Sequence, residues 1–253
     1  MRRVIIAANW KMNKTDQEAG EFIERLVNET KDINDREILV FPSSVHLKTA
    51  KKAAEGSNVT VGCQNMYHED SGAYTGEISP LMVKEFCSHI LIGHSERRGI
   101  FSETDTDVNK KLKKAFEHGL LPVVCIGETK EEKDAGKTKD VVSRMIEVGL
   151  SGITEEQLKK TVIAYEPVWA ISRGDPNHKA ATSEDAQELH SFIRGILRKM
   201  YGPVADDISI IYGGSAKPGN IKELMSKKDI DGVLSGNASL ELDSFMQMVS
   251  FDS

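Results

Sequence analysis

Short apolar runs rich in β-branched residues recur along the chain, and a polar segment with helical periodicity follows most of them. There are eight such runs, and each is apolar almost without interruption: VIIAANW, EILVFP, VTVGCQ, HILIGHS, LPVVCIGE, TVIAYEPVW, ISIIYGGS and DGVLSGNAS. Continuous apolar character is typical of parallel strands that are covered on both faces. The runs begin near residues 4, 37, 59, 89, 121, 161, 208 and 231. Their average spacing of about 32 residues is the size of one βαβ unit.

The intervening segments predict helices. Residues 17–30 carry apolar side chains at three- and four-residue steps behind Thr15, and Thr182 stands three residues before Asp185, which is close to a capping box. No linker rich in proline, serine or glycine divides the chain. The pattern therefore predicts an α/β protein with a single domain, residues 1–253, folded as a closed (β/α)8 barrel. An open, doubly wound sheet of eight strands is the alternative, and periodicity does not exclude it.

Composition narrows the class of protein. A chain of 253 residues with 39% hydrophobic residues is long enough to bury about three quarters of its unfolded surface. The net charge of −6 argues against nucleic acid or an anionic membrane as the main partner. No apolar run approaches the length of a membrane span, and the N-terminus lacks a signal-peptide pattern. Cys63, Cys87 and Cys125 have no CxxC spacing, so a cytoplasmic setting without disulfides or a zinc site is the simplest interpretation.

Polar side chains stand where several predicted strands end. In an α/β barrel the carboxyl ends of the strands and the loops that follow them carry the chemistry. A lysine, a histidine and a glutamate at three of these ends form a candidate proton-transfer set. The glutamate lies between VIAY and PVW, in apolar surroundings that suit a general base. The polar residues at these ends are Asn9, Lys11, His94, Ser95, Glu96 and Glu166.

Glycine-containing turns follow the seventh and eighth strands. The seventh ends in Gly213, Gly214 and Ser215, and the eighth ends in Gly236 and Asn237. Each turn is expected to run into a helix, and backbone N–H groups in such turns bind phosphate. The two turns together favour a phosphate site, although each glycine also suits an ordinary tight turn.

The candidates also have purely structural interpretations. Lys11 suits a solvated loop, and His94 suits a cap on a neighbouring helix. Cys125 is interpreted as a small core residue rather than a nucleophile, and the charged residues of 127–140 as a solvated helix face. The segment AGKTKD resembles a nucleotide-binding loop, but Glu131 stands where the first glycine of that motif belongs.

The segments NWKMN, IGHSERR, CIGET, AYEPVWAI and IYGGS stand in the order and at the spacings of the triosephosphate isomerase family, which the chain resembles from end to end. The resemblance implies a TIM barrel that interconverts dihydroxyacetone phosphate and D-glyceraldehyde 3-phosphate in glycolysis and gluconeogenesis, without a metal or organic cofactor. It implies that Glu166 is the base that moves a proton between C1 and C2. It further implies that His94 polarises the substrate oxygens and that Lys11 stabilises the enediolate, with Asn9 and Glu96 beside it.

The resemblance also implies a homodimer and a set of binding residues. The loop of residues 64–79 is expected to dock beside the partner's active site, with Thr75 at the position that reaches the neighbouring Asn9 and Lys11. The other expected interface and scaffold residues are Gln64, Glu77 and Arg97. The expected substrate-binding residues are Asn9, Lys11, Ser172, Ser215, Gly236 and Asn237.

Two departures from the family pattern fall at the phosphate end. The lid reads AISRGDPNHK where the family usually has A-I-G-T-G-K, so Ser172 replaces a glycine and the tip is four residues longer. Asn237 follows Gly236 where two successive glycines are usual, and asparagine tolerates positive φ well. These departures leave open an inactive barrel that serves as a binding protein. Two other phosphate-binding barrel enzymes are alternatives. A metal-dependent epimerase would need histidine and aspartate ligands at the strand ends, and the sequence shows none. A Schiff-base aldolase would need a lysine inside the barrel, often on the sixth strand, where this chain has Glu166.

Overall fold

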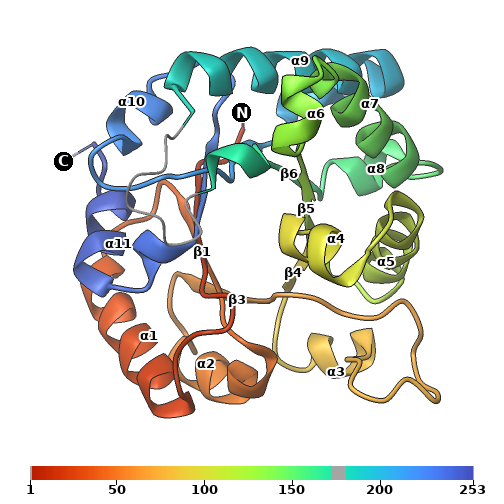
Figure 1. The fold of residues 1–253 in the computed structure, drawn as a ribbon. Coiled ribbons are helices and arrows are strands. Elements are labelled where there is room, and N and C mark those ends of the chain that lie inside the picture. The colour runs from red at the N-terminus through yellow and green to blue at the C-terminus, as the bar shows by residue number, and fades with distance from the viewer. Residues whose placement is uncertain (1, 172–180, 253) are drawn as a thin grey trace.

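Eight parallel strands close into a barrel in the computed structural model, which describes residues 2–171 and 181–252 (Figure 1). Each strand pairs with the next along the chain, and the last pairs with the first. This closure confirms the predicted (β/α)8 barrel and excludes the open sheet. The strands are β1 (Ile5–Asn9), β2 (Glu37–Phe41), β3 (Val59–Cys63), β4 (His89–Ile92), β5 (Leu121–Ile126), β6 (Val162–Tyr165), β7 (Ile210–Tyr212) and β8 (Gly232–Ser235).

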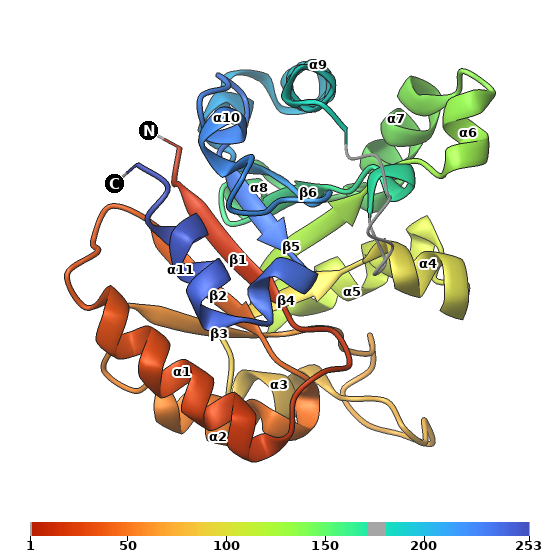
Figure 2. The same ribbon diagram turned by 60° about the vertical axis from the view of Figure 1, so that its left-hand side comes forward.

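Helices follow the strands along the chain and surround the barrel (Figures 1 and 2). The two longest begin where the sequence predicts, because Thr15 and Thr182 each cap a helix through a complete capping box. The helices are α1 (Asp16–Thr30), η1 (Ser44–His46), α2 (Leu47–Ala53), α3 (Pro80–Lys84), α4 (Ser95–Phe101), α5 (Asp105–Glu117), α6 (Lys130–Asp134), α7 (Thr138–Gly149), α8 (Glu155–Leu158), η2 (Val168–Ala170), α9 (Ser183–Tyr201), η3 (Gly202–Asp207), α10 (Ile221–Met225), η4 (Asn237–Ser239) and α11 (Leu242–Val249).

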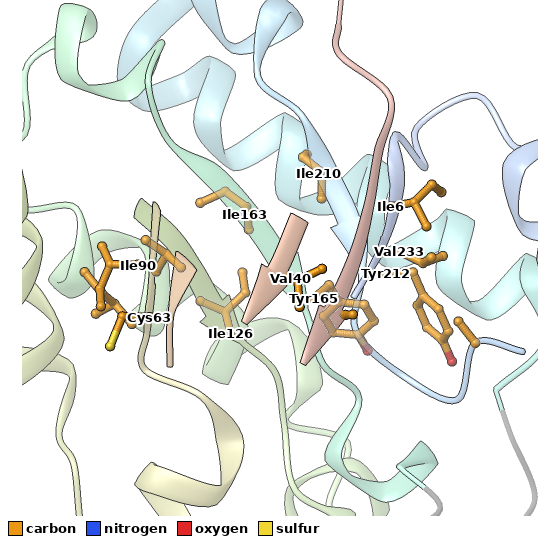
Figure 3. Packing of buried hydrophobic residues seen from close by; sticks show 14 of the residues in the cluster. Ile6, Val40, Cys63, Ile90, Ile126, Ile163, Tyr165, Ile210, Tyr212 and Val233 are labelled. Atoms are coloured by element: carbon orange, nitrogen blue, oxygen red, sulfur yellow. The ribbon is translucent and has the colours of Figure 1, made fainter. Parts of the chain in front are cut away.

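Both faces of the sheet are buried, which explains the continuous apolar runs. Ile5 and Ala7 belong to a cluster made of strand residues alone, so this cluster fills the inside of the barrel. Ile6, between them, belongs to a larger cluster that joins the strands to the helices (Figure 3). Cys125 lies fully buried in the inner cluster, which confirms that it is a core residue.

The loop of residues 64–79, between β3 and α3, extends away from the barrel (Figure 2). The amide of Tyr67 donates to the carbonyl of Ile78 at 2.8 Å, which closes the base of the loop. The hydroxyl of Ser79 donates to the carbonyl of Asp70 at 2.7 Å. The loop therefore has an internal framework, while its tip is exposed.

Candidate active site

Glu166 follows β6 directly at the carboxyl end of the barrel. Its amide donates to the carbonyl of Ile126 at 2.7 Å, which extends the pairing of β6 with β5. A Cβ at Gly127 would lie 1.9 Å from the carbonyl oxygen of Glu166, and a Cβ at Gly213 would lie 2.6 Å from its Cγ. A side chain at either position would displace Glu166. Sequence reasoning missed Gly127, because nothing in its local pattern separates it from other glycines.

The carboxylate of Glu166 is 2% exposed and meets two groups at the start of α4. Oε2 accepts a hydrogen bond from the amide of Ser95 at 2.9 Å, and Oε1 lies 3.1 Å from Nε2 of His94. Bonds of this kind to a carboxylate are stronger than bonds between neutral groups, and they offset its removal from water. The structure therefore brings together the glutamate and the histidine that the sequence places at separate strand ends.

His94 has the capping role that its sequence context left open. It is the N-cap residue of α4, where Nδ1 accepts a hydrogen bond from the amide of Glu96 at 3.2 Å. Because an amide N–H can only donate, Nδ1 carries a lone pair, and the neutral ring has its proton on Nε2. The nitrogen that faces Glu166 is thus a hydrogen-bond donor.

Lys11 has a backbone conformation that is uncommon for a residue with a side chain, with φ of +53°. Its amide donates to Oδ1 of Asn9 at 3.0 Å, and its carbonyl accepts from Nε2 of Gln64 at 2.8 Å. Its ammonium pairs with Oε1 of Glu96 at 2.6 Å. The interpretation as a solvated loop lysine is therefore wrong, because main chain and side chain are both held. Backbone strain of this kind clusters at functional sites.

Four of the five predicted catalytic residues line one pocket of about 190 Å³. The fifth, Glu166, meets this group through His94. A cation, a hydrogen-bond donor and a buried carboxylate thus converge at one end of the barrel. The pocket is lined by Asn9, Lys11, Met12, Gln64, Asn65, His94, Glu96, Arg97 and Phe101.

Two of the predicted phosphate-binding residues contact other parts of the site. A Cβ at Gly236 would lie 3.3 Å from Cε of Lys11, so the turn after β8 adjoins the lysine. The amide of Ser215 donates to the carbonyl of Ala170 at 3.2 Å, which ties the turn after β7 to the segment that follows Glu166. The two turns also meet, since the hydroxyl of Ser235 donates to the carbonyl of Ala216 at 3.2 Å.

The turns themselves differ from the expectation in two respects. The turn after β8 enters η4 directly at Asn237, as expected, but the turn after β7 does not, since α10 begins only at Ile221. Asn237 is exposed and is not among the residues with positive φ, so its tolerance of positive φ is not used. A Cβ at Gly214 would lie 2.2 Å from the hydroxyl of Tyr212, so close packing explains that glycine. Ser172, with the lid tip, lies outside the described residues.

Glu128 contradicts the interpretation of residues 127–140 as a solvated face. It is 1% exposed and accepts from Nε1 of Trp169 at 2.7 Å and from the hydroxyl of Tyr165 at 3.1 Å. Its carbonyl accepts from the amide of Val168 at 3.0 Å. Burial raises the pKa of this carboxyl above its usual value. Its partners, Tyr165 and Trp169, come from the end of β6 and the segment after it. The charged residues beside Glu128 in the sequence did not indicate this contact.

Of the four residues expected at a subunit interface, two are exposed and two contact other residues of this chain. Thr75 and Glu77 are exposed on the loop of residues 64–79. Gln64, at its base, contacts the backbone of Lys11, and its Nε2 also donates to the carbonyl of Phe41 at 2.9 Å. Nε of Arg97 pairs with Glu103 at 2.7 Å. Gln64 and Arg97 thus stabilise the site within this chain.

Residues 2–171 and 181–252 lack two kinds of feature. No helix in these ranges is long and apolar enough to cross a membrane. No group of three or more histidine, cysteine, aspartate or glutamate side chains in the same ranges is arranged to hold a metal ion.

Known proteins resemble this chain in sequence and fold. The family model described as triosephosphate isomerase matches residues 4–252. The triosephosphate isomerase of Clostridium botulinum (strain ATCC 19397 / Type A) is 51% identical over 99% of this chain and 100% of its own length, and that of Clostridium tetani is 48% identical over 99% and 97%. The crystal structure of triosephosphate isomerase from Bartonella henselae superposes with a TM-score of 0.87, at 38% identity and 97% coverage of each chain. The chain belongs to the triosephosphate isomerase family.

Proposed function

We propose that the protein interconverts dihydroxyacetone phosphate and D-glyceraldehyde 3-phosphate by proton transfer, a step of glycolysis and gluconeogenesis. The observation that carries the proposal is the contact between Glu166 and His94, a buried carboxylate 3.1 Å from a ring N–H. One group can remove a proton from carbon while the other donates to the adjacent oxygen, which is what an aldose–ketose isomerisation requires.

In the proposed reaction the substrate enters between the two groups. The carboxylate of Glu166 takes a proton from C1 of dihydroxyacetone phosphate, which gives an enediolate, and returns it to C2. Nε2 of His94 then donates to the substrate oxygens in place of Glu166 and passes a proton from O1 to O2, so that the C1 hydroxyl becomes the carbonyl and the C2 carbonyl becomes the hydroxyl. Because Nδ1 already accepts from the amide of Glu96, the ring is set in the tautomer that can donate there.

Electrostatic stabilisation of the enediolate is assigned to Lys11 and Asn9. The ammonium of Lys11 lies in the same pocket as His94, and its pairing with Glu96 fixes its position. A cation that is already oriented stabilises developing negative charge without reorganisation during the reaction. The hydrogen bond from Lys11 N to Asn9 Oδ1 fixes the side chain of Asn9 beside it.

We assign phosphate binding to the backbone of Ser172, Ser215, Gly236 and Asn237. The packing of Gly236 against Lys11 supports the assignment, because a phosphate beside this turn would also face the ammonium. The amide of Ser215 is engaged by Ala170, so its use for phosphate requires that bond to open. Phosphate binding would then be coupled to movement of the segment after Glu166.

A coupled assay of triose phosphate interconversion tests the proposal. Dihydroxyacetone phosphate is supplied and D-glyceraldehyde 3-phosphate is consumed by an added dehydrogenase. Activity that is lost in Glu166→Gln supports the assignment. Absence of activity in the unaltered protein would instead favour the inactive, ligand-binding barrel.

We also propose a homodimer through the loop of residues 64–79. Two apolar side chains at the mouth of the pocket, Met12 and Phe101, are exposed, Met12 by 95%, and such exposure is typical of an interface. Thr75→Arg should lower the molar mass in light scattering toward that of one chain and reduce activity. Ser151→Arg, an exposed position outside the loop, is the control.

A cytoplasmic setting is proposed on the state of the cysteines. All three are free and buried, as expected for a chain that folds where thiols remain reduced. Fractionation of the source cells, with activity followed in the cytosolic fraction, tests this.

A further inference from the structure

A second cavity of about 540 Å³ opens behind Glu166, and the described residues that line it do not include Lys11 or His94. Residues of the helices α4, α5, α6 and α7 contribute to its lining. The size is that of a site for a small organic molecule. The apolar part of the lining is formed by Ile126, Met145, Val148 and Val168.

Most charged groups of this cavity are already engaged by the protein. Glu103 accepts from the amide of Gly93 at 3.1 Å and pairs with Lys111 at 2.6 Å, and Oε2 of Glu132 accepts from the amide of Thr129 at 2.9 Å. The guanidinium of Arg98 is likewise divided among three partners, the carbonyls of Gly93 and Cys125 and the carboxylate of Asp105. These groups shape the cavity and leave little capacity for a ligand.

Ser95 and Arg144 carry groups that the protein leaves available to a ligand. The hydroxyl of Ser95 at the inner end is buried, with the residue 8% exposed, and has no hydrogen-bond partner among the described residues. An unpartnered buried hydroxyl is uncommon in folded proteins. Arg144 lines the outer part, and its side chain is 55% exposed. Nε of Arg144 meets Asp105 at 3.0 Å, and within residues 2–171 and 181–252 no hydrogen bond holds its two terminal nitrogens.

We propose that this cavity binds a small aromatic monocarboxylate with a hydroxyl at the far end of the ring. The carboxylate would pair with the terminal nitrogens of Arg144, and the ring would lie on Met145 and Val148. The hydroxyl would bond to Ser95. A second anion would not suit the inner end, because Glu166 lines it.

Occupancy of the cavity has a kinetic consequence, which rests on the proposed function. Glu166 is tied to the amide of Ser95, so a ligand held by the hydroxyl of the same residue fixes the base in this position. The ligand does not occupy the pocket of Lys11 and His94. It therefore lowers kcat and leaves KM for the triose phosphate unchanged.

Titration calorimetry with 4-hydroxyphenylacetate tests the site itself. Binding is expected to weaken about tenfold in Arg144→Gln and to disappear in Val148→Trp, which fills the cavity. Lys139→Gln, which removes a cation from the same helix outside the cavity, should bind as the unaltered protein does. Phenylacetate, without the hydroxyl, should bind more weakly. No binding at millimolar ligand, or equal binding in Val148→Trp, would overturn the site.

The coupled assay with 4-hydroxyphenylacetate tests the kinetic consequence separately. The expected result is a fall in kcat in the unaltered protein and none in Val148→Trp. A rise in KM that persists in Val148→Trp would mean binding in the substrate pocket, which contradicts the proposal. If 4-hydroxyphenylacetate bound in calorimetry but left kcat unchanged, the proposed inhibition would be refuted and the binding site would remain supported. Since calorimetry needs no turnover, a protein without isomerase activity would still report on the site.

Discussion

Nε2 of His94 lies 3.1 Å from Oε1 of Glu166, although the two residues belong to the ends of different strands. The amide of Glu96 sets the tautomer of the ring, and the amide of Ser95 holds the other carboxylate oxygen. One helix start therefore orients both partners of the proposed proton transfer. Much of the site is preorganised by backbone groups, which side-chain substitutions elsewhere leave in place.

Glu166→Asp and Glu166→Gln are expected to lower kcat by about 10² to 10⁴-fold, the usual contribution of a positioned base. Aspartate keeps the charge but withdraws the carboxylate by one methylene, while glutamine keeps the length and removes the basicity. Both are measured in the coupled assay, with circular dichroism and thermal unfolding as checks on the fold. A variant that retains nearly full kcat would refute the role of Glu166.

Gly213→Ala is expected to lower kcat with little effect on the fold. Its new Cβ would lie 2.6 Å from Cγ of Glu166, so the carboxylate must shift. Misplacement of a reacting group by about 1 Å can reduce the rate about 10²-fold. Gly195→Ala on α9 is the matched control, because no atom lies within 4 Å of its added Cβ. Equal activity of the two variants would show that Gly213 does not position the base.

The strands were predictable because each one is a long apolar run bounded by polar residues. The apolar runs that begin near residues 161, 208 and 231 correspond to strands that begin at Val162, Ile210 and Gly232. A strand that is buried on both faces repeats the same signal over several residues, so its position is well defined. The residues at the strand ends followed from the barrel, since parallel strands present them all at one end.

Contacts between distant segments could not be predicted in the same way. Glu128 lies among charged residues in the sequence, and its burial depends on Tyr165 and Trp169, which come from the next strand's end. The positive φ of Lys11 is accompanied by a hydrogen bond to its carbonyl from Gln64, which follows β3. Such contacts depend on how distant segments pack together, and the local pattern of apolar and polar residues does not indicate them.

Glu128→Gln is expected to change how stability depends on pH. Burial raises the pKa of Glu128 in the folded state, so the folded protein holds this proton at a pH where the unfolded chain has lost it. The stability that this carboxyl contributes is present below the usual glutamate pKa and is lost as pH rises through the raised pKa. Relative to the unaltered protein, the variant should therefore gain stability as pH rises above about 4.

Urea unfolding at intervals over that range measures the difference. Glutamine can still accept from Nε1 of Trp169, so the main change is the loss of a buried titrating group. Glu131→Gln, an exposed position on α6, is the control and should leave the pH dependence unaltered. If the free energy of unfolding changed with pH in the same way for Glu128→Gln and the unaltered protein, burial would not perturb the pKa of this carboxyl.

His190 should make the folded protein less stable in acid. Burial lowers the pKa of His190 to about 4, and the charge of Arg194 acts in the same direction. Between pH 6.5 and about 4 the unfolded chain binds a proton that the folded protein does not, so stability falls with pH by up to about 3 kcal/mol. His190→Asn can keep the hydrogen bond that Nδ1 makes to the carbonyl of Asp229, at 3.1 Å, but cannot titrate. Urea unfolding from pH 7 to pH 4 should show a flatter decline for the variant, whatever its stability at pH 7. An equally steep decline would assign the acid sensitivity to other groups.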